Sequence, residues 1–151
     1  MSKNDVSNIN TILRGLQTEY KDYVTDETDI KLETTLPDDF TLKTNENMLR
    51  RILSCLMDNA VKYTEKGCIT IKASMAGDQL QMIVTDTGNG IPVEEAERIF
   101  DRFVKLDNFK EGIGLGLPLS RRLAEQLGGK IELDTTYTDG AQFIVTLPIS
   151  E

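Results

Sequence analysis

The sequence predicts an α+β two-layer sandwich, in which a mixed, mostly antiparallel sheet lies under a layer of about three helices. Segments with apolar residues at helical spacing are interspersed with segments in which apolar and polar residues alternate. Several of the alternating segments follow each other closely, as on either side of Ala76-Gly77-Asp78, a pattern typical of hairpins. The 151 residues, 39% hydrophobic and 28% charged, are enough for one domain with its own core.

The N-terminal part is expected to contain a polar, frayed segment over 1–8 and then a helix. Apolar residues recur at helical spacing from Ile9 to Tyr20, which predicts an amphipathic helix over 8–24. This helix either packs on the domain's own core or serves as a docking surface. The further elements, in order, are strands over 28–36 and 40–42, a helix over 45–64 capped by Asn45, strands over 68–74 and 79–86, a short helix over 94–103, a glycine-bearing loop over 108–116, a helix over 118–127 with Pro118 in its first turn, and strands over 130–136 and 141–147.

Composition excludes several classes of function. The net charge of −8 argues against binding to nucleic acid or to a membrane surface, and no apolar run approaches the roughly 18 residues of a membrane span. The two cysteines, Cys55 and Cys68, lack the spacing of a metal site. The chain has no histidine, so it cannot form a Ser-His-Asp triad, ligate a metal through histidine, or accept a phosphoryl group on its own histidine.

The helix over 45–64 carries the first candidate chemistry. On a helical wheel, Asn59 and Lys62 fall on the polar side, opposite a stripe that includes Leu53 and Ala60. An amide oxygen can ligate Mg²⁺, and a neighbouring lysine can neutralise phosphate oxygens. Without further evidence, a solvated helix face is the simpler interpretation of this pair.

Two glycine-bearing segments follow. Asp86 ends a strand and precedes Thr87-Gly88-Asn89-Gly90-Ile91-Pro92, so its carboxylate can accept a hydrogen bond from an exocyclic amino group such as that of adenine. The segment 111–118 brings closely spaced glycines to a helix N-terminus, which favours an anion, although its spacing matches neither the dinucleotide fingerprint nor the phosphate loop. The alternatives are a strand-to-helix turn and a flexible loop, respectively.

The order of these segments resembles the catalytic ATP-binding domain (HATPase_c) of sensor histidine kinases, within the superfamily of gyrase, chaperone, kinase and MutL ATPases that share the Bergerat fold. The resemblance covers about residues 8–150. Residues 56–64 are similar to the N box, 86–90 to the first glycine box, 99–103 to the F box and 112–117 to the second glycine box, and 128–131 and 140–143 match the closing strands.

The resemblance implies ATP and Mg²⁺ as cofactors, with Asn59 as the metal ligand and Asn59 and Lys62 as the catalytic residues. It implies an ATP lid over 104–111, with Phe100 and Phe103 at its base. The residues implied in nucleotide binding are Asn59, Lys62, Tyr63, Asp86, Gly88, Gly90, Ile91, Phe100, Lys105, Lys110, Gly112, Gly114, Leu115 and Gly116.

Two positions depart from the family pattern. Cys55 stands where a second asparagine is common, and it is a poor ligand for a hard cation. Ala141 stands where a threonine is usual, which removes a hydroxyl from the adenine end of the site. A degenerate nucleotide-binding or docking module is therefore one alternative function, and an anti-sigma-type serine kinase is another, although the Phe-Asp-Arg-Phe segment argues against the latter.

The implied partners are a histidine-bearing dimerisation domain, which accepts the γ-phosphoryl group, and the receiver domain of a response regulator downstream. The helix over 9–24 resembles the stretch that follows that dimerisation domain, so residues 9–151 are expected to be one catalytic domain of a larger sensor kinase. We expect this domain in the cytoplasm, without direct membrane contact, and any attachment of the parent protein to the inner membrane outside this sequence.

Overall fold

A computed structural model describes residues 6–24, 27–63, 67–87, 113–134 and 140–148. Its elements are β1 (Val6–Asn8), α1 (Ile9–Tyr20), the 3-10 turn η1 (Lys21–Tyr23), β2 (Thr28–Thr34), β3 (Thr41–Lys43), α2 (Glu46–Tyr63), β4 (Gly67–Ala76), β5 (Gln79–Asp86), α3 (Ile113–Gln126), β6 (Lys130–Leu133) and β7 (Gln142–Pro148). Within these residues, no helix is long and apolar enough to cross a membrane.

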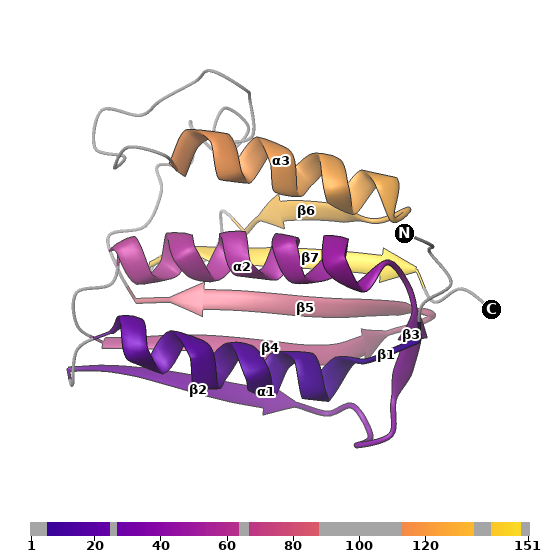
Figure 1. Ribbon diagram of the computed structural model, residues 1–151, viewed down its shortest axis with the longest axis horizontal. Helices are drawn as coiled ribbons and strands as arrows, with labels where there is room; N and C mark the ends of the chain where they lie inside the picture. Colours follow the sequence, from indigo (N-terminus) through magenta and orange to yellow (C-terminus); the bar gives the residue numbers. More distant parts are fainter. Residues whose placement is uncertain (1–5, 25–26, 64–66, 88–112, 135–139, 149–151) are drawn as a thin grey trace.

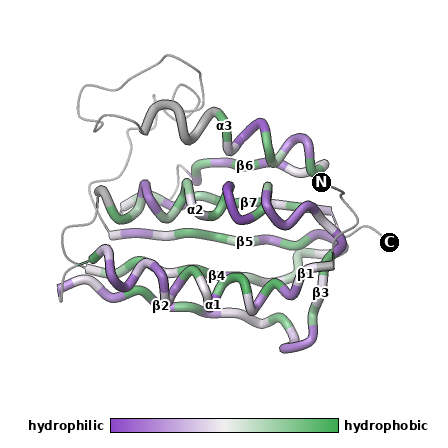
Figure 2. The backbone as a smooth tube through the Cα atoms, viewed as in Figure 1, coloured by the Kyte–Doolittle hydropathy of each residue, from purple (hydrophilic) through white to green (hydrophobic). Residues whose placement is uncertain are grey.

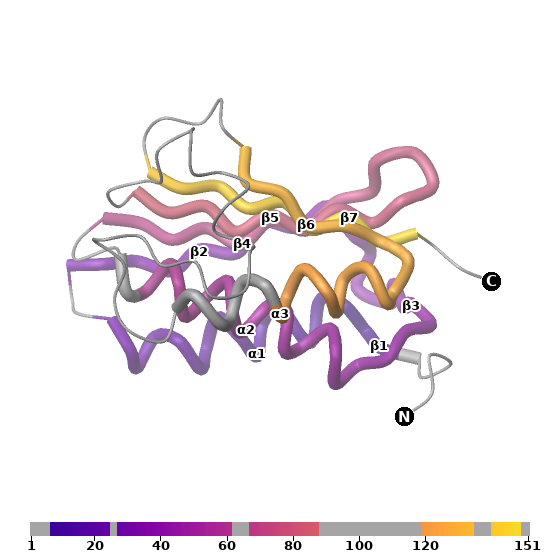
Figure 3. Tube along the Cα trace, turned by 90° about the horizontal axis from the view of Figure 1, so that it is seen from above, coloured from indigo at the N-terminus to yellow at the C-terminus, as the bar shows by residue number. Residues whose placement is uncertain are grey.

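The main sheet has five strands in the order β2-β4-β5-β7-β6. The pair β2–β4 is parallel, and the other three pairs are antiparallel. The helices α1, α2 and α3 lie on one side of this sheet (Figures 1 and 3), where α1 contacts β2, α2 contacts β5, and α3 contacts β6 and β7. The predicted α+β two-layer sandwich is confirmed.

The core lies between the helices and the sheet. Along β4, Ile69, Ile71 and Ala73 are buried while the residues between them are more exposed, as expected for a sheet with one covered face. The helices contribute matching apolar stripes, and Figure 2 shows apolar and polar residues alternating along both helices and strands. The largest fully buried side chains include Ile9, Ile12, Leu13, Leu49, Ile52, Leu53, Leu56, Met57, Leu80 and Phe143.

The N-terminal segment differs from the prediction. Residues 1–8 were expected to be frayed, but Val6–Asn8 form β1, which pairs antiparallel with β3. The polar side chains suggested exposure, yet they make specific hydrogen bonds. The hydroxyl of Ser7 donates to Glu46 Oε1 at 2.9 Å, and Asn8 caps α1 by accepting from the backbone N–H of Thr11 at 3.0 Å.

The helix α1 packs on this domain's own core. Asn10 is fully buried, and its side-chain N–H groups donate to the carbonyl oxygens of Leu36 and Pro37 at 3.0 and 3.1 Å, while its Oδ1 accepts from Thr34 Oγ1 at 2.8 Å. Gln17 Nε2 donates to the carbonyl oxygen of Ile30, in β2, at 2.9 Å. Of the two roles that the sequence left open for this helix, the structure supports the core-packing one.

The boundaries of the later helices were predicted unequally well. The cap at Asn45 is confirmed, because its Oδ1 accepts from the backbone N–H of Met48 at 3.2 Å. The helix α3, in contrast, begins at Ile113, five residues before the predicted start at Pro118, so the predicted loop over 108–116 is wrong for 113–116. A glycine costs a helix only about 1 kcal/mol, which packing of α3 against α2 can offset. The helix predicted over 94–103 lies outside the described residues.

Candidate functional site

Asn59 is the most informative predicted site residue. It lies near the C-terminal end of α2 and is only 2% exposed, so its predicted place on a solvated polar face is wrong. Within the described part of the chain, its Oδ1 is the buried side-chain polar atom without a hydrogen-bond partner. A buried amide oxygen without a partner costs about 1–3 kcal/mol. Such an atom is therefore a candidate to bind something besides the protein itself.

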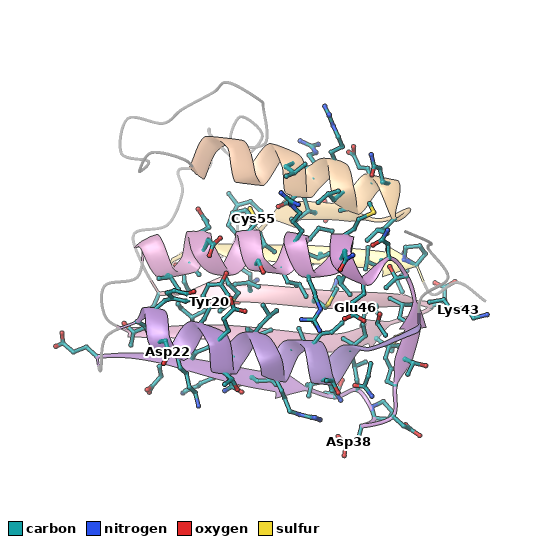
Figure 4. The ribbon with its side chains drawn as sticks, in the orientation of Figure 1. Tyr20, Asp22, Asp38, Lys43, Glu46 and Cys55 are labelled. Carbon is teal, nitrogen blue, oxygen red and sulfur yellow. The ribbon has the colours of Figure 1, made fainter. Side chains whose placement is uncertain are left out.

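Cys55 lies one helical turn before Asn59, on the side of α2 that faces α3 (Figure 4). Its thiol is hydrogen-bonded to Ser120 of α3, whose side chain is buried. Burial raises the pKa of the Cys55 thiol to about 11, so the group stays protonated at neutral pH. A protonated thiol held by a hydroxyl is a poor ligand for a hard cation, in line with the sequence-based interpretation.

Asp86 ends β5 and is 2% exposed. Its backbone N–H donates to the carbonyl oxygen of Ala141 at 2.9 Å, and its Oδ1 accepts from the backbone N–H of Ala141 at 3.1 Å. The carboxylate is therefore held by the backbone of Ala141, directly before β7. Backbone donors of this kind orient an acceptor without depending on side-chain rotamers.

Gly140 is a residue whose role the sequence analysis missed. A Cβ atom at this position would overlap the backbone oxygen of Asp86 and lie 2.9 Å from its Oδ1. Only a residue without a side chain lets the backbone at position 140 approach the backbone of Asp86 this closely. In the sequence, Gly140 stands out only as the first residue of the segment 140–143, which matches the closing strands.

These elements meet at one end of the molecule. Figure 1 shows the C-terminal ends of α2 and β5 on the same side of the molecule as the N-terminal end of α3, and α2 contacts both β5 and α3. Lys62 and Tyr63 belong to the last turn of α2. Gly114, Leu115 and Gly116 belong to the first turns of α3, rather than to a loop in front of it. The predicted residues Gly88, Gly90, Ile91, Phe100, Phe103, Lys105, Lys110 and Gly112 lie outside the described residues.

The chemistry available at this end is that of two buried polar groups that can bind a ligand rather than that of a protein-only metal centre. Asn59 offers an amide oxygen and Asp86 a carboxylate, and both residues are buried, the first on α2 and the second at the end of β5. The described residues contain no group of three or more cysteine, aspartate or glutamate side chains placed to hold a metal ion. Among the described residues, a cation bound near Asn59 finds no complete ligand set, and oxygens of a second molecule or of water can supply further ligands, as nucleotide phosphates do for Mg²⁺.

Comparison with known proteins decides the family. Residues 44–151 match the family model described as "Histidine kinase-, DNA gyrase B-, and HSP90-like ATPase". The chain belongs to this ATPase family. The resemblance inferred from the four boxes is thereby confirmed, and the family match includes Asn59, Asp86 and Gly140.

The similar proteins are named as kinases. The chain is 39% identical over 128 residues to the adaptive-response sensory kinase SasA of Gloeothece citriformis (strain PCC 7424). This alignment covers 82% of this chain and 33% of that protein. The catalytic domain of the histidine kinase ThkA, in a nucleotide-free form, matches with a TM-score of 0.86 and 27% identity, over 96% of this chain and 95% of that one. Full-length ShkA in complex with AMPPNP matches with a TM-score of 0.85 and 30% identity, over 97% of this chain and 31% of that one.

The extent of these matches agrees with the fold. The chain spans about one third of the length of the SasA relative and nearly all of the ThkA catalytic domain. The family match begins at residue 44, yet α1 and β2 belong to the same helical layer and the same sheet as the later elements. The segment before the family match therefore packs with the later elements in one structural unit.

Proposed function

We propose that this chain is the catalytic domain of a sensor histidine kinase that binds ATP with Mg²⁺ and donates the γ-phosphoryl group to a histidine on a partner dimerisation domain. Catalysis in such a domain consists of positioning the nucleotide and neutralising charge. The receiver domain of a response regulator is the acceptor further downstream. We assign the domain to the cytoplasm as part of the same proposal.

The observation that carries this proposal is the buried Oδ1 of Asn59, which has no hydrogen-bond partner in the part of the chain that the structure describes. An amide oxygen is a suitable ligand for a hard cation, and a cation bound there explains why the atom is kept buried without a partner among the described residues. Asp86 complements it, because a buried carboxylate at a strand end can accept from the exocyclic amino group of adenine. Lys62 and the glycines of 112–116 are the proposed contacts of the phosphates, Tyr63 is proposed to line the nucleotide site, and the predicted lid over 104–111 remains part of the proposal.

A second domain is required because this chain has no histidine. The phosphoryl acceptor must lie elsewhere in the parent protein or on another protein. The relatives support such an arrangement, since this chain covers only 33% of the SasA kinase. A histidine-bearing domain outside this sequence is therefore the proposed partner.

A degenerate nucleotide-binding module is the second candidate function. The observation that favours it is the contact between Cys55 and Ser120, which occupies the thiol at a position where a second metal ligand is expected. Under this alternative, the domain binds nucleotide weakly and transfers no phosphate.

The test is a calorimetric titration of this chain with the non-hydrolysable analogue AMP-PNP, performed once in the presence of Mg²⁺ and once in the presence of EDTA. The proposal predicts saturable binding that Mg²⁺ strengthens at least several-fold. Binding that is independent of Mg²⁺ would support the degenerate module. An absence of binding under both conditions would refute nucleotide binding altogether.

A further inference from the structure

Tyr20, the last residue of α1, is linked to α2 through its hydroxyl. The side chain is 4% exposed, and its hydroxyl oxygen lies 2.6 Å from Asp58 Oδ1 and 3.2 Å from the carbonyl oxygen of Ser54. In the part of the chain that the structure describes, these are the side-chain hydrogen bonds that join α1 to α2. Figure 4 shows Tyr20 between the two helices.

The hydroxyl is suited to a fixed donor role. Burial, together with the hydrogen bond to Asp58, raises the pKa of Tyr20 above its usual value, so the group keeps its proton at physiological pH. A phenylalanine would fill almost the same space. The hydroxyl therefore adds direction to a contact that the ring alone would leave to apolar packing.

The position of this contact on α2 connects it with the candidate site. Ser54 and Asp58 are one turn apart and share the side of α2 that faces α1. Asn59 is the next residue, about 100° further around the helix. Cys55, on the same face as Asn59, is held by Ser120 of α3. The rotation of α2 about its own axis is thus fixed from both sides, by Tyr20 and by Ser120.

We propose that Tyr20 is a positioning residue, which sets the rotation of α2 and thereby the place of Asn59 Oδ1 in the nucleotide site. This inference rests on the proposed role of Asn59 toward Mg²⁺. A side-chain oxygen lies about 5–6 Å from a helix axis, so a rotation of about 10° moves it by about 1 Å. Displacements well below that matter at a metal, where ligand distances hold within about 0.2 Å.

The other polar contacts of α1 provide the comparison. Gln17 binds the carbonyl oxygen of Ile30 in β2 and makes no contact with α2 among the hydrogen bonds of the described residues. Removal of the Gln17 contact loosens α1 on the sheet without releasing Asp58. Variants at Tyr20 and Gln17 therefore separate a general loosening of α1 from a specific effect on α2.

The test measures the dissociation constant of AMP-PNP for this chain in EDTA and in Mg²⁺. We define the magnesium ratio as the dissociation constant in EDTA divided by the dissociation constant in Mg²⁺. Tyr20→Phe should lower this ratio about 3- to 10-fold while leaving the dissociation constant in EDTA within about twofold of the parent. Asp58→Ala should do the same. Asp58→Asn, which keeps an acceptor oxygen, should retain the parent ratio, and the double variant Y20F/D58A should lose no more than either single variant.

The control variant is Gln17→Met, with thermal unfolding measured for every variant. It should lower the melting temperature by a few degrees, as Tyr20→Phe does, but leave the magnesium ratio unchanged. If the parent ratio is above one and Tyr20→Phe has the same ratio, the positioning role of Tyr20 is overturned while the proposed role of Asn59 stands. An equal fall in Gln17→Met would also overturn it, because the effect would then be general loosening. A parent ratio of one would overturn both this inference and the proposed role of Asn59.

Discussion

Replacing Asn59 by leucine should make the nucleotide-free protein more stable. The buried Oδ1 of Asn59 has no hydrogen-bond partner among the described residues, and a buried acceptor in this state costs about 1–3 kcal/mol. Leucine has the same number of side-chain heavy atoms in the same branched arrangement and carries no acceptor that needs a partner, but its methyl groups take up more space than the amide, which offsets part of the gain. After allowance for imperfect fit, we expect a gain of about 1 kcal/mol, or about 2–4 °C in melting temperature for a chain of this length.

Asn10 provides the matched control, because it is equally buried but fully hydrogen-bonded. Its side chain binds two carbonyl oxygens and accepts from Thr34 Oγ1. Asn10→Leu leaves these partners buried and unpaired, so it should destabilise the protein by about 2–4 kcal/mol. The same substitution should thus have opposite effects on stability at the two positions.

Thermal unfolding without nucleotide measures both variants, and calorimetry with AMP-PNP then measures binding. Asn59→Leu should lose the Mg²⁺-dependent part of the affinity while gaining stability. This combination indicates that the asparagine is kept for a ligand and not for the fold. If Asn59→Leu is destabilised as strongly as Asn10→Leu, or binds Mg²⁺ with AMP-PNP as the parent does, the reasoning about this oxygen is wrong.

Four further predictions follow from the site and its surroundings. Asp86→Asn should reduce the preference for ATP over GTP by about tenfold in competition binding, because the carboxylate that accepts from the adenine amino group is lost; an unchanged preference would contradict this assignment. Gly140→Ala and Gly129→Ala should each lower the melting temperature, since a Cβ at either position overlaps a backbone oxygen, but only Gly140→Ala should weaken nucleotide binding, because its clash is with Asp86. Alkylation of Cys55 by iodoacetamide, followed by mass spectrometry, should be slow at pH 8 and accelerate up to about pH 11, in line with its raised pKa; fast reaction at neutral pH would refute its burial. The hydrogen bonds from Arg50 and Ser7 lower the pKa of Glu46 below its usual 4.5, so the stability difference between the parent and Glu46→Gln should be constant above pH 4.5 and shrink as the pH falls below it, which chemical denaturation at several pH values can check.

The sequence predicted those features that depend on local pattern. The alternation from Cys68 to Ser74 and from Gln79 to Asp86 identified two central strands, since one face of the sheet is covered. Asn45 was predictable as a cap because its side chain acts within its own helix turn. The order of the boxes predicted the family, which the match over 44–151 confirms.

The sequence could not predict features that depend on tertiary contacts. Asn59 is buried because other elements pack around α2. A helical wheel shows only the residues of the helix itself and contains no information about these neighbours. The strand β1 forms because β3 lies beside it, and polar residues such as Ser7 gave no local sign of this pairing. The steric need for Gly140 depends on Asp86, which is 54 residues away in the chain. Roles assigned to residues 88–112 remain predictions, because these residues lie outside the described part of the structure.

Phosphoryl transfer to a histidine on a second domain tests the central claim most directly. The measurement incubates this chain with γ-labelled ATP and Mg²⁺, alone and together with the histidine-bearing domain of the same parent protein, and follows acid-labile label on each polypeptide. We predict label on the added domain, none on this chain, which has no histidine, and loss of transfer in Asn59→Leu. Acid-labile label on this chain by itself, or no transfer to its own parent's histidine domain, would contradict the account.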